Sequence, residues 1–334
     1  MVGHCHAGGD EAARGQAQRE AGVETRGRCG LGRRLQAHRG RCIEEGTEGV
    51  VQVSDVQVRI AALNVYPIKS CAGIALDETL LVETGFEFDR AWMVVDAEGR
   101  FVTQRELPRM ALVKPTLKHE EMVLRAPGML ALHLSLNAVE APCRVTVWRD
   151  EVAAYDMGDL AVQWFSDFLG QKLRLVRFDP EQKRLSNRQW TGEIEAENAF
   201  SDGYPVLVAS QAALDELNQR LAAAGHAAVT MARFRPNLVI DGIESHGEDH
   251  LDEIEFNAGR VRLKLVKPCP RCPIPDIDPA TAERGHAVGD MLLTYRADPR
   301  VDGAITFGMN AVILAGIEQP LRVGLAGDAT YRFD

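Results

Sequence analysis

Two cysteines in a proline-rich stretch are the residues of this 334-residue chain best suited to chemistry. Cys269 and Cys272 are separated by two residues, and Pro270, Pro273 and Pro275 stand beside them. A Cys-x-x-Cys pair can belong to a structural zinc site, a redox-active dithiol, a disulfide, or a site where one thiolate binds a softer metal. The surrounding sequence distinguishes among these four.

The rest of the chain argues against three of them. A structural zinc site needs four ligands, usually from a second pair of similar spacing, and the sequence has no second pair. A redox dithiol usually opens a helix, which the prolines disfavour. Seven cysteines, an odd number, scattered over a long chain indicate a reduced compartment rather than a disulfide framework. The remaining reading is a single thiolate ligand to a thiophilic metal, with the other cysteine as a neighbour.

Basic residues near strand ends and turns are a second group of candidates. Each by itself fits a solvated surface residue, but together they fit a pocket for a phosphate-bearing cofactor, because the guanidinium fork matches phosphate oxygens. The spacing does not show that they converge. The basic candidates are Lys69, Arg90, Arg105, Arg233 and Arg235, and the small polar residues beside them are Ser70, Thr103 and Asn237.

Short alternating segments separated by turns supply the elements that would position these residues. They predict strands near 56–66, 79–82, 91–95, 101–103, 122–124, 130–134, 144–148, 238–240, 254–256, 261–265 and 305–314. The segment 261–265 leads directly into the two cysteines. So many short strands are typical of a barrel or a sandwich.

Only two helices are expected, and both read as cover for a sheet edge or barrel mouth. The first begins at the capping residue Asp159 and ends at Gly170. The second is capped by Ser210 and ends at Gly225. The polar segment 187–197 between them is expected to be a mobile loop. His246 and His250 are interpreted as part of an acidic surface loop rather than as metal ligands.

Composition and net charge indicate the class of protein and its cellular compartment. A hydrophobic fraction of 46% and a charged fraction of 26% are those of an ordinary globular protein. The net charge of -10 argues against a surface for nucleic acid or anionic lipid, and no apolar run is long enough to span a membrane. A cytoplasmic protein is therefore expected.

The first fifty residues differ from the rest. They contain eight arginines, eleven glycines and no aromatic residue, so they cannot bury enough apolar area to offset the entropy of ordering. We expect residues 1–52 to be a disordered or mis-assigned N-terminal extension. They lack the apolar core of a signal peptide, and their acidic residues do not fit a transit peptide.

Several blocks resemble the MOSC family. Residues 64–71, 88–92 and 101–109 are similar to the family's N-terminal β-barrel module, and residues 233–237, 269–279 and 307–310 are similar to the MOSC domain. The resemblance implies an α+β, mainly β fold, in which the N-terminal module (56–180) packs on a MOSC β-barrel (195–330) with a few covering helices. The blocks occur in the family's order, and the likeness covers roughly residues 58 to 328.

The resemblance also implies a cofactor and a reaction. The family binds the molybdenum cofactor, a molybdopterin whose metal is ligated by one cysteine, here Cys272. The residues that would contact the pterin and its phosphate are Lys69, Ser70, Arg90, Thr103, Arg105, Arg235 and Asn237. Reductase members remove oxygen from small N-hydroxylated substrates. Their electrons would come from a separate donor, such as a ferredoxin-like protein, a flavoprotein or a cytochrome b5-like protein, because the chain has no four-cysteine cluster motif.

Two points leave an alternative open. Reductase members usually carry an aliphatic pair and two threonines after the cysteine, where this chain has Pro273, Ile274, Pro275 and Asp276. Some MOSC domains are instead fused to a pyridoxal-phosphate desulfurase, for which too little chain precedes Val58. The alternative function is a non-catalytic carrier of the molybdenum cofactor or of sulfur.

Overall fold

The computed structural model describes residues 54–138 and 140–332. The chain divides into the segment Met1–Val51 and a compact unit, Gln52–Asp334. The expected extension over 1–52 lies outside the described residues. Among those residues no helix is long and apolar enough to cross a membrane.

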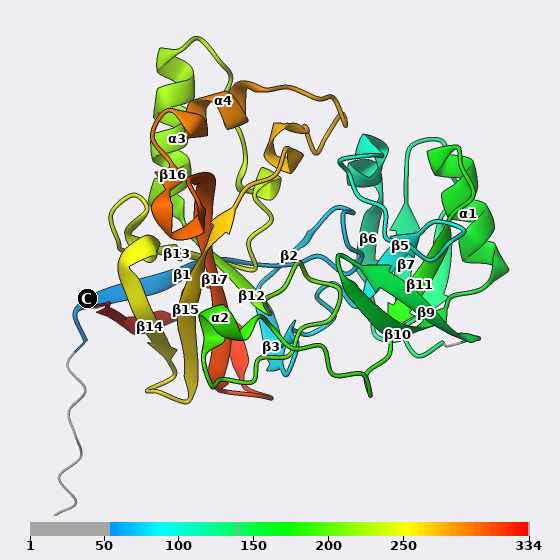
Figure 1. The fold of residues 1–334 in the computed structure, drawn as a ribbon, viewed down its shortest axis with the longest axis horizontal. Coiled ribbons are helices and arrows are strands. Elements are labelled where there is room, and N and C mark those ends of the chain that lie inside the picture. Colours follow the sequence, from blue (N-terminus) through cyan, green and yellow to red (C-terminus); the bar gives the residue numbers. More distant parts are fainter. Residues whose placement is uncertain (1–53, 139, 333–334) are drawn as a thin grey trace, which may run out of the picture. The chain divides into compact units, whose positions relative to one another are not determined.

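The compact unit contains a closed barrel of seven strands (Figure 1). Neighbouring strands pair in the order β12, β13, β1, β19, β14, β15 and β17, and β12 also pairs with β17, which closes the ring. All pairings are antiparallel except that of β12 with β13. The seven strands are β1 (Val56–Val65), β12 (Val206–Ser210), β13 (Leu238–Asp241), β14 (Leu251–Phe256), β15 (Val261–Pro270), β17 (Ala304–Ala315) and β19 (Ala326–Tyr331).

Alternation along these strands fills the barrel. Inward-facing aliphatic and aromatic side chains such as Ile60, Leu263 and Phe256 are almost completely buried in one core. Gly308 lies within β17 at φ +78°, and a Cβ there would lie 2.6 Å from the carbonyl oxygen of Val208. A glycine is therefore required where β17 approaches β12, and β17 continues through it.

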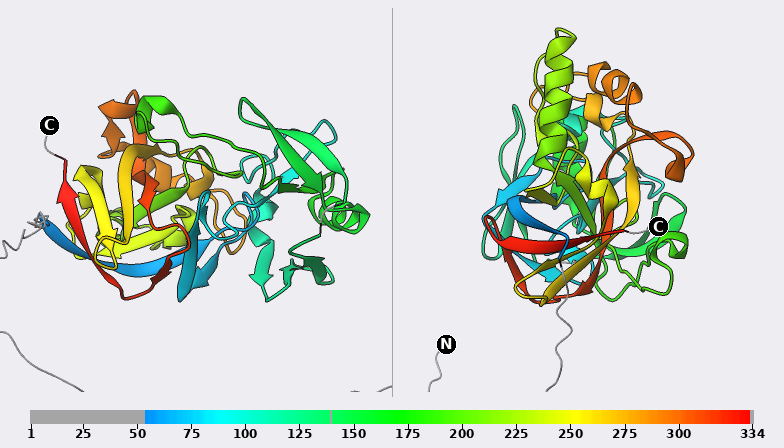
Figure 2. Two further views of the ribbon diagram at one scale, coloured as in Figure 1. Left: turned by 90° about the horizontal axis from the view of Figure 1, so that it is seen from below. Right: turned by 90° about the vertical axis from the view of Figure 1, so that its left-hand side faces the viewer.

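The first and last strands of the described chain lie side by side in the barrel, as Figure 2 shows in blue and red. β1 falls within the expected first domain (56–180), yet it pairs with β13 and β19, which fall within the expected second domain (195–330). Backbone pairing thus joins the two expected regions through β1. Their exact boundaries stay a prediction.

The remaining strands form smaller sheets. A four-stranded sheet has the order β5-β11-β10-β9, and two three-stranded sheets have the orders β6-β7-β8 and β18-β3-β4. Helix α1 (Asp159–Leu169) packs Phe165 and Phe168 into a second core with Trp92. The bounds are β3 (Glu78–Val82), β4 (Gly85–Phe86), β5 (Trp92–Val95), β6 (Lys114–Leu117), β7 (Glu121–Arg125), β8 (Leu132–Ser135), β9 (Pro142–Val147), β10 (Asp150–Asp156), β11 (Arg174–Phe178) and β18 (Pro320–Arg322).

The mainly β architecture with few helices confirms the expected fold class. Strand β2 (Ile74–Leu76) pairs with β1, and β16 (Ala297–Asp298) pairs with β17. The longest helix, α3 (Gln211–Ala223), packs against α4 (Ala287–Leu293). Short 3-10 turns complete the fold: η1 (Pro108–Leu112), η2 (Met231–Arg233), η3 (Gly247–His250), η4 (Ile274–Asp276) and η5 (Pro299–Val301).

The helix ends test the capping predictions. The Ser210 side chain accepts a hydrogen bond from the Ala213 N–H at the start of α3, as predicted. The prediction for Asp159 was wrong: Gly158 is the cap of α1, and Asp159 is the first helical residue. The predicted mobile loop over 187–197 was also wrong in part, because the Asn187 side chain caps a short helix, α2 (Arg188–Thr191).

Candidate functional site

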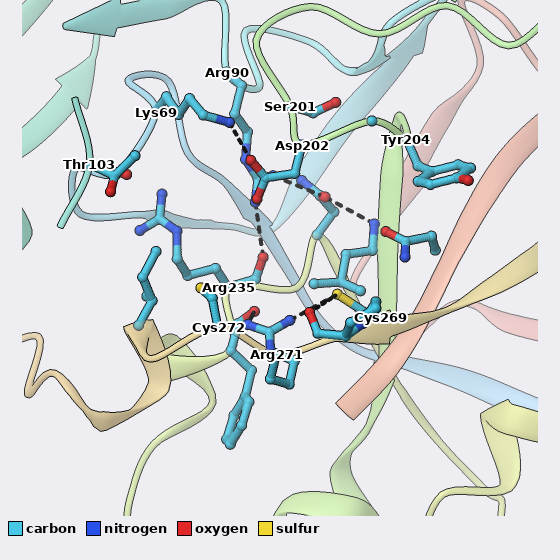
Figure 3. Close-up of a pocket in the computed structure, with 18 of the residues that line it drawn as sticks. Lys69, Arg90, Thr103, Ser201, Asp202, Tyr204, Arg235, Cys269, Arg271 and Cys272 are labelled. Atoms are coloured by element: carbon cyan, nitrogen blue, oxygen red, sulfur yellow. Dashed lines mark hydrogen bonds and ion pairs between the residues drawn. The ribbon is translucent and has the colours of Figure 1, made fainter. Parts of the chain in front are cut away.

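The eight residues that the family resemblance assigned to the site all line one pocket of about 240 Å³, part of which Figure 3 shows. They come from loops far apart in the sequence: the turn after β1, the β4–β5 loop, the loop after β5, the segment between η2 and β13, and the end of β15. Only the tertiary structure brings these loops together. The eight residues are Lys69, Ser70, Arg90, Thr103, Arg105, Arg235, Asn237 and Cys272.

The two cysteines stand at the end of β15. Cys269 is still in the strand, and Cys272 lies in the loop between β15 and η4. The Arg271 backbone N–H donates to the Ile305 carbonyl oxygen, which ties the loop to β17. Both thiols are free and half-buried, and both line the pocket. As expected from the prolines, the segment directly after the pair is the 3-10 turn η4 and not an α-helix.

The side chain of Arg271 links this loop to Phe234, at the end of η2. Its Nη1 donates to the sulfur of Cys269 at 3.1 Å, and its Nη2 donates to the Phe234 carbonyl oxygen at 3.0 Å. Its Nε is buried without a hydrogen-bond partner among the described residues. By contrast, Cys272 makes no hydrogen bond through sulfur to any described residue. The two thiols are therefore unequal, and that of Cys272 is available to a ligand.

Two guanidinium groups lie over the ring of Tyr66. The Arg90 and Arg235 groups are 4.4 and 4.2 Å from the ring centroid. Arg90 is fixed by hydrogen bonds to Asp89 and Asn237, and Arg235 donates through Nη1 to the carbonyl oxygen of Cys71. The Nη2 of Arg235 is buried and has no partner among the described residues.

Burial and the charge of Arg90 together lower the pKa of Arg235 to about 10. The side chain is still charged at neutral pH, so the protein holds a poorly compensated cation at the pocket. Both arginines have positive φ, +49° for Arg90 and +58° for Arg235, a conformation that non-glycine residues rarely adopt. The backbone is therefore held in place by its surroundings to present these two side chains.

Lys69 is the buried cation on another wall. Its Nζ donates to the Phe200 carbonyl oxygen at 2.8 Å and to the Asp202 carboxylate at 2.5 Å. Burial lowers the pKa of Lys69, and the neighbouring Asp202 opposes this. Ser70 follows at φ +66°, and its carbonyl oxygen accepts from Gln104. Lys69 is thus already paired, whereas the hydroxyl of Ser70 makes no hydrogen bond to a described residue and can bind a ligand in the pocket.

Arg105 lies at the mouth of the pocket, and its neighbour there, Thr103, is buried. The Thr103 hydroxyl accepts from the Nε of Arg105 at 3.1 Å and lies against the carboxylate of Glu106. The Arg105 guanidinium lies 4.7 Å from the centroid of the Trp148 ring. No described residue bonds to the terminal nitrogens of Arg105, so this fork is free to bind an anion.

Asn237 lines the pocket and also holds neighbouring segments of it together. Its Oδ1 accepts from Arg90 and from the Leu207 N–H, and its Nδ2 donates to the carbonyl oxygen of Asn64. Arg233, the other arginine of the same motif, does not line the pocket. It donates to Asp278 and to the carbonyl oxygen of Pro275, and so holds the segment after the cysteines.

Sequence reasoning did not select several residues that line the pocket, namely Arg271, Asp202, Trp148, Tyr204 and Asn310. Arg271 lies between the two cysteines, so its position was the one available signal. Asp202 and Trp148 carry no local signal, because they meet only through a hydrogen bond from the indole of Trp148 to the Asp202 carboxylate at 3.1 Å.

The histidine segment corrects one expectation. His250 is exposed, but His246, Glu248 and Asp249 are buried, so this is not simply an acidic surface loop. Both ring nitrogens of His246 and the Oε2 of Glu248 lack hydrogen-bond partners among the described residues, although the Nε2 of His246 lies 3.8 Å from the Glu216 carboxylate. Burial lowers the pKa of His246 to about 4. Burial, with a smaller effect of Asp249, raises the pKa of Glu248 to about 7.

The raised pKa of Glu248 predicts a pH-dependent stability. The folded protein keeps a proton that the unfolded chain releases near its ordinary pKa of 4.5. The free energy of unfolding should therefore fall as pH rises from about 4.5 through 7, by about 3 kcal/mol. Glu248→Gln should remove this part of the dependence and leave the variant more stable than the original at pH 8. Urea unfolding from pH 5 to 8 measures it.

Glu181→Gln is the matched control, because Glu181 is exposed. Its pH dependence should equal that of the unchanged protein. If Glu248→Gln behaves like Glu181→Gln across this range, Glu248 is ionised in the folded protein and the prediction is wrong.

The structure thus defines a class of protein: a closed seven-stranded barrel whose strand β15 presents an accessible thiol to a cation-lined pocket. Comparison with protein families agrees. Residues 57–172 match the MOSC N-terminal beta barrel domain and residues 195–326 match the MOSC domain.

Named relatives match over most of the described chain. Mitochondrial amidoxime reducing component 2 of Rattus norvegicus is 36% identical over 253 residues, which cover 71% of this chain and 72% of that protein. Mitochondrial amidoxime-reducing component 1 of Homo sapiens is 34% identical over 66% of this chain and 67% of its own. Molybdenum cofactor sulfurase of Bos taurus is 29% identical over 75% of this chain but only 30% of its own. The chain belongs to the MOSC family.

Proposed function

We propose that this protein binds the molybdenum cofactor and reduces N-hydroxylated compounds, with Cys272 as the protein ligand to the metal. The observation that carries the proposal is the pairing of an unpartnered thiol with a strongly cationic pocket. Five basic side chains and one acidic side chain line the pocket: Lys69, Arg90, Arg105, Arg235, Arg271 and Asp202. In a chain of net charge -10, such a concentration of positive charge favours an anionic ligand.

Unpartnered donors support an anion in this pocket. The Nη2 of Arg235 and the Nε of Arg271 are buried without partners among the described residues, and a buried donor left unpaired costs free energy. A phosphate-bearing cofactor supplies acceptor oxygens for such donors. Arg105, with its free fork at the mouth, adds a further contact for an anion.

The metal-binding side chains of the pocket fit a metal that takes most of its ligands from a cofactor. Among residues 54–138 and 140–332, no group of three or more His, Cys, Asp or Glu side chains is placed to hold a metal ion. A metal bound here would take the Cys272 thiolate and depend on its cofactor for the rest. Thiolate is a suitable ligand for a soft metal held in this way.

The proposed roles follow from the contacts. Arg235 and Arg105 bind the anionic group, and Ser70 adds a hydroxyl group. The Thr103 hydroxyl donates to Glu106 and accepts from Arg105, so its role is to position Arg105. Arg90 and Asn237 hold each other and the segment that carries Arg235. Lys69 fixes Asp202 at the edge of the pocket.

The bound cofactor would supply a two-electron reduction that converts an N–OH group and two protons into N–H and water. The chain's own residues hold the substrate beside Cys272 and leave the mouth open, so that the protons come from solvent. The electrons come from a separate donor protein, which we expect to be ferredoxin-like, a flavoprotein or cytochrome b5-like. The names of the amidoxime-reducing relatives support the choice of substrate.

Metal analysis together with a turnover assay tests the proposal. Protein purified from a molybdenum-sufficient host should contain close to one molybdenum per chain and should reduce an amidoxime when an artificial electron donor is supplied. Absence of molybdenum would refute cofactor binding. Bound molybdenum without any N–OH reduction would instead support the alternative function, a carrier of the cofactor or of sulfur.

A further inference from the structure

A second cavity adjoins the cofactor pocket and opens more widely to solvent. Its volume is about 940 Å³, which is within the range of small-molecule sites. It shares five lining residues with the first pocket: Arg105, Trp148, Asp202, Gly203 and Tyr204. We call this cavity the vestibule, because a molecule that reaches Cys272 from this side passes through it.

The acidic groups of the vestibule are already engaged. Asp150 is paired with Arg184 at 2.8 Å, and Asp202 is paired with Lys69. The carboxylate of Glu106 accepts hydrogen bonds from the backbone and hydroxyl of Thr103. Lys267 and Arg149 also line the vestibule, and neither has a carboxylate partner among the described residues. The positive charge left over is therefore available to an incoming molecule.

Lys267 is the better placed of these two cations. It lies on β15, the strand that ends at the cysteines, and its Nζ is 5.3 Å from the ring centroid of Trp190 and 5.9 Å from that of Tyr204. Two aromatic rings hold the ammonium group by cation–π attraction without neutralising it. Arg149 is exposed, and we assign it no more than a contribution to the local field.

We propose that Lys267 selects substrates that carry an acidic group, so that the preferred class is aromatic N-hydroxylated compounds bearing a carboxylate. The Trp148 and Tyr204 rings supply apolar walls between Lys267 and the cofactor pocket. The N–OH group enters the pocket that contains Cys272, and the carboxylate pairs with Lys267 in the vestibule. This substrate class rests on the proposed reductase function, but the binding of the acidic group does not depend on turnover.

Equilibrium binding of two product analogues tests the proposal. Amidines are the products of amidoxime reduction, so benzamidine and para-amidinobenzoate differ only in the carboxylate. Titration calorimetry with the purified protein, its molybdenum content determined beforehand, should show para-amidinobenzoate binding about tenfold more tightly. Equal affinities for the two amidines would overturn the proposal.

Three variants locate the effect. Lys267→Gln should abolish the preference for para-amidinobenzoate and leave benzamidine binding within about twofold, while Lys267→Arg should retain the preference. Lys264→Gln is the matched control on the same strand, where the lysine pairs with Asp252 and Glu253 away from the vestibule. A preference that survives in Lys267→Gln refutes the role of Lys267.

Two outcomes would separate the selection by Lys267 from the proposed reductase function. If the protein reduces both an amidoxime and its carboxylated form with equal kcat/KM, the reductase function stands and the selection by Lys267 is refuted. If the protein lacks molybdenum but still prefers para-amidinobenzoate through Lys267, the acidic-group site stands and the reductase function fails.

Discussion

Cys272→Ala is expected to lower both the molybdenum content and the rate of N–OH reduction by about two orders of magnitude or more. Loss of partners outside the ligand set already costs a metal site ten- to a hundredfold, and loss of a ligand should cost at least as much. No other cluster of metal-binding side chains exists among the described residues to replace Cys272. Metal analysis and a steady-state assay measure the two effects.

Folding should be unaffected by this change, because Cys272 is half-buried and its sulfur has no hydrogen bond to a described residue. Cys269→Ser is the matched control from the same loop. Its sulfur already accepts from Arg271, so the variant should keep its molybdenum and lose less than about tenfold in rate. Equal losses in the two variants, or full molybdenum in Cys272→Ala, would show that Cys272 is not the ligand.

Arg235→Met is expected to weaken retention of the cofactor by about tenfold to a hundredfold, the effect of losing a charge-assisted contact to an anion. The stability of the cofactor-free protein should change by less than about 1 kcal/mol. The variant loses the hydrogen bond to the carbonyl oxygen of Cys71, but it also loses a buried cation whose Nη2 has no partner among the described residues. Molybdenum content after dialysis and urea unfolding measure the two quantities.

Arg109→Met provides the comparison. Arg109 also lies over an aromatic ring, 4.4 Å from the centroid of Phe168, but it does not line the pocket. This variant should retain the cofactor fully. If Arg109→Met lost as much cofactor as Arg235→Met, the loss would follow from changing any stacked arginine. The specific role of Arg235 in binding the cofactor would then be refuted.

Local sequence patterns were sufficient for much of the fold. Alternation identified β1, β14 and β15, and the Ser210 cap and the glycine beyond the helix located α3, because these signals act within one element. The failures were also local. Asp159 has the chemistry of a cap but lies one residue inside the helix, and the polar segment 187–197 contains a short helix started by Asn187.

The many short strands indicated a barrel or a sandwich, but their pattern did not choose between the two. Closure depends on pairing of β12 with β17 and of β1 with β19, and in both pairs the two strands lie far apart in the sequence. The sequence of a strand does not identify the strand with which it pairs. The prediction of a barrel therefore depended on the family resemblance, which the matches to both family models and to the relatives confirm.

The stretch around Cys269 and Cys272 shows which features could be predicted from the sequence and which could not. The sequence by itself determined that a stiff loop presents two thiols after a strand, because proline restricts the backbone locally. It also supplied the basic residues that now line one pocket. Only the tertiary structure decided that Arg271 donates a hydrogen bond to Cys269, whereas the sulfur of Cys272 has no hydrogen bond to a described residue. It also decided that Arg233 supports the loop while Arg235 faces the pocket. Such distinctions depend on contacts between residues far apart in the chain, which no local pattern encodes.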